Sequence, residues 1–90
     1  MRSKVTKQFR AQFAALPAAV QRQAREAYQL FKANPYHPSL HFKPIHSGDP
    51  AIYSARVGIR YRVIGILEGD TIIWGWIGSH ADYDKVIHRL

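Results

Sequence analysis

Residues 52–77 read IYSARVGIRYRVIGILEGDTIIWGWI and contain three apolar stretches separated by two turn signals. The first stretch alternates, with Tyr53, Ala55 and Val57 on one side, as a half-buried strand does. The other two stretches are rich in β-branched and aromatic residues, which suit a pleated surface. Gly58 marks the first turn, and the acid-Gly-Asp step at 68–70 marks the second. The segment therefore predicts three antiparallel strands, at Ile52–Val57, Arg60–Leu67 and Thr71–Ile77.

Two amphipathic helices are predicted ahead of these strands. In Lys4–Leu16, apolar residues recur at helical spacing, and Pro17 ends the pattern. The second helix covers Ala18–Ala33 and stops at Asn34-Pro35, because proline disfavours helical backbone in the preceding residue. The very short connection between the two helices implies an antiparallel hairpin.

The remaining segments are a proline-rich loop and a final helix. The loop covers residues 35–50 and contains a short predicted strand at Leu40–Lys43. From Asp82 on, apolar residues repeat at helical spacing, with Asp82 or Ser79 as the cap. The predicted fold is α+β. It is a single domain of residues 1–90, with a helical hairpin packed on a three- to four-stranded antiparallel sheet and a short C-terminal helix.

The charge of the chain is concentrated in its first half. Residues 1–48 contain eight Lys or Arg and one acid, whereas residues 49–90 contain five basic and five acidic residues. This asymmetry favours a polyanionic or acidic protein partner, although a solvated basic surface remains the alternative. Cysteine is absent, which excludes disulfides and thiolate metal sites. The basic start of the chain continues into a patterned helix, so we expect no targeting peptide.

Arg56, Arg60 and Arg62 surround the first turn, and the strand register decides their arrangement. A two-residue loop would send Arg56 and Arg62 to opposite faces. A three-residue loop at residues 58–60 would place Arg56 directly opposite Arg62. We predict the three-residue loop, because it gathers an apolar set on one face: Tyr53, Ala55, Val57, Tyr61 and Val63. The paired like charges destabilise the sheet by about a few tenths of a kcal/mol, which a bound polyanion would relieve. Neutralisation by acidic side chains or solvent is the alternative.

Two further groups of residues could carry chemistry. His80 follows the last strand, and imidazole suits proton transfer near neutral pH. Nearby Tyr83 could supply a hydroxyl or a stacking ring, or it could simply pack beside a helix cap. The loop residues His41, Lys43 and His46 could face phosphate, or they could simply belong to an exposed loop. Together with His37, these histidines match no metal-ligand spacing, so we predict neither a metal nor a cofactor.

Trp74 and Trp76 lie two residues apart and are predicted to share one face of the third strand, in the core or at a partner interface. If they were exposed, they would form a stacking platform instead. The candidate chemical groups are therefore Arg, His, Lys and Tyr. This set suits RNA phosphodiester cleavage through the neighbouring 2′-hydroxyl, with arginines stabilising the phosphorane.

Several stretches together resemble the RelE/ParE toxin superfamily of bacterial toxin–antitoxin systems. The strand pair resembles the family segment Tyr-x-x-Arg-Val-Gly followed by Tyr-Arg, and the end resembles Ile-Gly-x-(His/Arg)-x-Asp-x-Tyr. The resemblance covers nearly the whole chain, at Phe9–Phe13, Phe31, Asn34–Leu40, Ile52–Gly58, Tyr61–Ile64 and Ile77–Tyr83.

The resemblance implies a cytoplasmic toxin that cleaves mRNA in the ribosomal A site and is neutralised by an acidic or amphipathic antitoxin segment. It implies that Arg56 and Arg62 hold the scissile phosphate, that His80 is the acid or base, and that Tyr83 stacks or assists. His41, Lys43, His46 and Arg60 would bind RNA.

Two positions depart from the family pattern, and the family's opening strand is only weakly matched. Ser54 stands where the best-known members carry lysine, and Tyr83 comes one residue early. Only Lys4–Thr6 could form the family's opening strand. The alternatives to the nuclease are a non-enzymatic ParE-like inhibitor of DNA gyrase and an inactive antitoxin-binding module.

Overall fold

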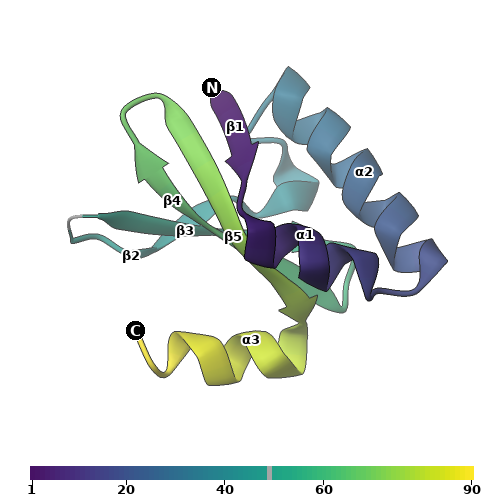
Figure 1. The fold of residues 1–90 in the computed structure, drawn as a ribbon. Helices are drawn as coiled ribbons and strands as arrows, with labels where there is room; N and C mark the ends of the chain where they lie inside the picture. Colours follow the sequence, from purple (N-terminus) through teal and green to yellow (C-terminus); the bar gives the residue numbers. More distant parts are fainter. Residues whose placement is uncertain (49) are drawn as a thin grey trace.

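A five-stranded sheet carries helices α1 and α2 on one face and α3 on the other (Figure 1). The structure is a computed structural model that describes residues 1–48 and 50–90. In chain order the elements are β1 (Arg2–Val5), α1 (Lys7–Ala14), α2 (Ala18–Ala33), the 3-10 turn η1 (Pro38–Leu40), β2 (Lys43–His46), β3 (Ala51–Val57), β4 (Tyr61–Glu68), β5 (Thr71–Ser79) and α3 (His80–Ile87). None of the described helices combines the length and apolar character that a membrane span needs.

The sheet order is β1-β5-β4-β3-β2, which confirms the α+β class with a larger sheet than predicted. Strands β2 to β5 form an antiparallel meander, and β1 pairs in parallel with β5. The first helix was expected from Lys4, but it begins at Lys7 with Thr6 as its cap. Strand β1 forms because it satisfies the outer edge of β5, where the Thr6 amide donates to the Trp74 carbonyl at 3.0 Å.

The short strand predicted at Leu40–Lys43 lies three residues further along the chain. Leu40 ends the 3-10 turn that Pro38 begins, and His41 adopts a left-handed backbone with φ of 47°. This reversal directs Phe42 into the core, and pairing with β3 starts only at Lys43. The proline-rich composition therefore delays the strand rather than abolishing it.

The three-residue turn between β3 and β4 is confirmed. Val57 pairs with Tyr61, and Arg56 pairs with Arg62. Gly58 opens the turn with φ of 61°, a backbone conformation that side chains rarely allow. The register places the predicted apolar set against α1 and α2.

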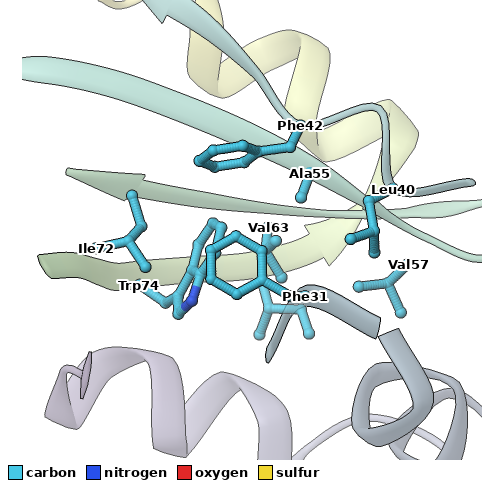
Figure 2. Close-up of a cluster of buried hydrophobic side chains, with 9 residues drawn as sticks. Phe31, Leu40, Phe42, Ala55, Val57, Val63, Ile72 and Trp74 are labelled. Carbon is cyan, nitrogen blue, oxygen red and sulfur yellow. The ribbon is translucent and has the colours of Figure 1, made fainter. Parts of the chain in front are cut away.

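Aromatic rings fill the space between the helices and the sheet (Figure 2). Phe31 of α2 meets Trp74 edge-on at 5.4 Å between centroids, and Phe42 stacks on Tyr53 at 4.7 Å. The Trp74 indole N–H donates to Ser3 Oγ at 2.9 Å, so its one polar atom is satisfied inside the core.

The prediction that Trp74 and Trp76 share a face is wrong. The β4–β5 register shifts between Ile64 and Gly65, which pair with Trp76 and Trp74 respectively, and Gly75 is left as the extra residue of a bulge. The two indoles consequently lie on opposite faces, Trp74 among the core aromatics and Trp76 beside Tyr83 of α3.

Helix α3 is held on the second face by Tyr83. Ser79 caps the helix by accepting from the Asp82 amide at 3.1 Å, which settles the choice between the two predicted caps. The Tyr83 ring is 7% exposed, and its hydroxyl donates to Ser54 Oγ on β3 at 3.2 Å. The short helix is therefore tied to the middle of the sheet.

Replacing Gly65 by alanine should destabilise the protein by about 1–3 kcal/mol, because the core has no room for the methyl group. An added Cβ would lie 2.7 Å from the Trp74 ring and 2.9 Å from Ile72. Gly75→Ala is the matched control, since its Cβ would meet nothing closer than 3.8 Å, and it should change stability by less than about 0.5 kcal/mol. Urea unfolding of both variants measures the difference. Equal effects would contradict the packing described for this strand pair.

Candidate active site

Arg56 and Arg62 lie side by side on the face of the sheet that α1 and α2 leave open. They are direct cross-strand partners, one residue pair away from the turn. Because paired residues of an antiparallel ladder point to the same face, both guanidinium groups project toward the side that carries α3. The like-charge pair predicted from the sequence is present.

Neither arginine is neutralised by a carboxylate within residues 1–48 and 50–90. Arg62 Nη1 donates to the carbonyls of Ile59 and Tyr61, at 3.2 and 3.0 Å. Arg56 Nε is buried with no hydrogen-bond partner in the described residues. Burial lowers the pKa of the Arg62 guanidinium, the charge of Arg56 lowers it further, and Tyr83 and Asp84 oppose the shift. The pair therefore presents unsatisfied donors and excess positive charge, which together suit an oxyanion.

His80 stands at the start of α3, next to the arginine turn. Its backbone amide donates to the Arg60 carbonyl at 2.6 Å, which fixes the end of β5 against the turn. The His80 ring Nδ1 lies 3.3 Å from Asp84 Oδ2, and about half of the side chain is exposed (49%). An Nδ1–H donated to Asp84 would leave Nε2 as the proton acceptor of the ring. The arrangement suits a general base with a carboxylate that orients it.

Tyr83 is close to the arginines but inaccessible. The ring packs 6.0 Å from the His80 ring and 6.4 Å from Trp76, measured between centroids. With its hydroxyl bound to Ser54, Tyr83 anchors α3 in this conformation and is not a free stacking ring. Ser54, where the family pattern has lysine, here supplies a buried partner for that hydroxyl.

The four predicted RNA-binding residues are all exposed. Two of them share the face of the arginine pair, and two lie outside the strands. Lys43 pairs with Ser54 and His46 pairs with Ile52, so both belong to the same face as Arg56. Arg60 lies in the turn whose carbonyl binds the His80 amide. His41 lies outside the strands, at the left-handed residue after the 3-10 turn.

The loop histidines do not gather. Among the described residues, His37, His41 and His46 form no group of three side chains that could hold a metal ion. Instead, His37 Nδ1 lies 2.8 Å from Ser39 Oγ and helps cap the 3-10 turn.

One residue near the site was missed in the sequence, and another was predicted on the wrong face. Asp84 stands four residues after His80, a spacing that brings helical side chains together and could have been recognised. Trp76 reaches the arginine face only through the bulge at Gly75. A strict count of alternating residues cannot detect this displacement.

Comparisons with known proteins give the same fold. A family model for the ParE-like toxin domain matches residues 18–85. A chain of the archaeal RelE–RelB complex from Pyrococcus horikoshii OT3 is 23% identical with a TM-score of 0.70, and the match covers 87% of this chain and 92% of that chain.

Two further solved structures are similar. A chain of the RelB–RelE antitoxin–toxin complex from Methanococcus jannaschii is 20% identical with a TM-score of 0.72, over 92% and 96% of the two chains. YafQ from E. coli strain BL21(DE3) is 18% identical with a TM-score of 0.66, over 92% and 98%. No curated protein sequence matches. Since the family model spans more than half of the chain, the protein belongs to the ParE-like toxins of the RelE/ParE superfamily.

Proposed function

We propose that this toxin is a metal-independent endoribonuclease that cuts mRNA in the ribosomal A site and so blocks translation in the cytoplasm. The observation that carries the proposal is a pair of arginines without carboxylate partners among the described residues, next to a turn whose Arg60 carbonyl accepts from the amide of half-exposed His80. A structural ion-pair network would have neutralised these arginines. Groups that hold and cleave a phosphodiester need the unpaired arrangement instead.

The proposed reaction is transesterification within the RNA strand. His80 Nε2 takes the proton of the 2′-hydroxyl, whose oxygen attacks the adjacent phosphorus. The bond to the 5′-oxygen breaks, and that oxygen takes a proton from solvent, leaving a 2′,3′-cyclic phosphate and a 5′-hydroxyl end. Arg56 and Arg62 stabilise the extra negative charge on the phosphorane. Asp84 is a positioning residue that acts through His80.

The outer basic residues would bind the RNA on either side of the cut. Lys43 and His46 extend the positive face across β3 to the edge strand β2. Arg60 and His41 are exposed at the borders of this face. Contacts of this kind hold the phosphate backbone without reading the base sequence.

Arg56→Gln, Arg62→Gln and His80→Gln should each lower mRNA cleavage by about 10²-fold or more, because each removes charge stabilisation or proton transfer. The measurement is in vitro translation of one mRNA, followed by mapping of the new 5′ ends. Arg22→Gln is the matched control, an equal loss of charge on the exposed side of α2, and it should cleave like the unaltered protein.

The same assay separates the alternatives. Intact mRNA together with blocked DNA supercoiling would replace the nuclease proposal by a gyrase inhibitor. No effect in either assay would leave a module that only binds the antitoxin.

Tyr83→Phe tests the positioning role of the tyrosine. The variant loses one buried hydrogen bond and should lower the free energy of unfolding by about 1 kcal/mol. Cleavage should fall by less than about tenfold, since the ring still packs on Trp76. A loss as large as that of His80→Gln, with stability unchanged, would instead assign the Tyr83 hydroxyl to the chemistry.

An acidic amphipathic antitoxin segment would dock on the opposite face. An apolar groove of about 680 Å³ lies between α1, α2 and the sheet, with Phe9, Phe13 and Trp74 among its lining residues. Lys4, Arg10, Arg25 and Arg56 also line it, and no Asp or Glu of the described residues does. Grooves of this character accept the apolar face of a helix. Two of the similar structures are RelE–RelB complexes, which supports an antitoxin partner.

Charge reversal at the groove should weaken antitoxin binding. Arg10→Glu and Arg25→Glu each place an acid beside the proposed acidic segment, and the dissociation constant should rise about tenfold or more in low salt. Titration calorimetry with the cognate antitoxin measures the change. Arg22→Glu carries the same charge change outside the groove lining and is the control. Equal weakening by all three variants would show a general charge effect and contradict docking in the groove.

A further inference from the structure

Trp76 is the aromatic residue that the strand bulge delivers to the arginine face. The chain contains two tryptophans, and if the strand alternated regularly through Gly75 both would lie on one face; the bulge at Gly75 separates them. Trp74 is 6% exposed within that core, whereas Trp76 is half-buried on the other side. The bulge thus places the indole ring of Trp76 next to the proposed phosphate site.

The indole of Trp76 lies in the row of the two arginines. Arg56 pairs with Arg62, and Arg62 pairs with Gly78. A Cβ at Gly78 would lie 2.6 Å from Trp76 Cζ2 and 2.8 Å from Cη2. The six-membered ring therefore fills the place that a side chain at residue 78 would take, one strand spacing of about 4.8 Å from the Arg62 backbone. The guanidinium groups of Arg56 and Arg62 and the indole of Trp76 therefore follow one another in a row across the sheet.

Tyr83 is not available as a stacking surface for a base. Its hydroxyl is bound to Ser54, and its ring is buried between α3 and the sheet. Tyr83 packs against Trp76 with the ring planes tilted by 44°. This contact supports the indole in place, so the half-buried tryptophan is the aromatic group within reach of a nucleotide held by the arginines.

We propose that Trp76 is the base-stacking platform of this site. A nucleobase next to the scissile phosphate stacks on the indole while Arg56 and Arg62 hold the phosphate. The inference rests on the proposed ribonuclease function and adds a binding determinant to it. Stacking on an aromatic ring is tolerant of base identity, so Trp76 supplies affinity and placement for any base rather than codon choice.

The test uses a short single-stranded RNA with 2′-O-methyl groups, which lacks the attacking hydroxyl and stays intact. Binding of this probe should quench the tryptophan fluorescence of the unaltered protein and leave that of Trp76→Phe almost unchanged, because only the buried Trp74 then reports. Trp76→Leu, which removes the ring, should bind the probe about tenfold more weakly. Trp76→Phe keeps a ring and should retain most of the affinity. Circular dichroism and urea unfolding establish that both variants are folded.

A second probe of the same length, with abasic sites in place of the bases, separates stacking from packing. Trp76→Leu should bind the abasic probe as well as the unaltered protein does. If Trp76→Leu weakens both probes equally, or if Arg62-dependent binding occurs without quenching, the stacking role is wrong and the nuclease proposal stands. If Arg62→Gln leaves binding of the base-containing probe unchanged, the phosphate site and the platform both fail.

Discussion

The pairing of β3 with β4 determines the arrangement of nearly every other feature of the molecule. A shift of one residue would exchange the two faces of β4 and carry Arg62 into the apolar core. Val57 and Val63 fill that space, and an unpaired guanidinium there would be strongly destabilising. The packing of the helix-facing residues therefore enforces the register, and the register places two cations together on the other face. The like-charge pair is a consequence of the hydrophobic core.

The arrangement of the two arginines destabilises the sheet locally. Burial of the Arg62 guanidinium disfavours its charged form, and the adjacent like charge of Arg56 disfavours it as well, so both lower the pKa of Arg62. Two carbonyls of the turn hold Arg62 in place, whereas Arg56 Nε has no hydrogen-bond partner in the part of the chain that the structure describes. Donors fixed before the substrate arrives need little reorganisation when charge develops, which is the general benefit of such a strained arrangement.

The sequence predicts those helices and strands whose apolar periodicity marks the face that is buried in the core. Alternation located β3, the matching of apolar faces gave the register at Gly58, and helical spacing gave α2 over its full length. The resemblance offered Lys4–Thr6 for the opening strand, whereas β1 covers Arg2–Val5, which has no apolar alternation and pairs with the edge of β5. The bulge at Gly75 and the bond between Tyr83 and Ser54 depend on residues from different elements. The residue pattern within a single element therefore cannot predict either feature.

The sheet separates two binding surfaces by the thickness of one layer of backbone. Ala55, Val57 and Val63 contribute to the floor of the apolar groove, and their neighbours Arg56 and Arg62 form the proposed phosphate site on the reverse side of the sheet. A segment bound in the groove would contact the same two strands that hold the arginines, and it would meet Arg56, which contributes to the groove lining, but not Arg62. Neutralisation from the groove alone would then depend on obstructing the approach to the ribosome or on shifting strands β3 and β4. Direct masking of Arg62 would need a second stretch of antitoxin that crosses the edge of the sheet to the face of α3.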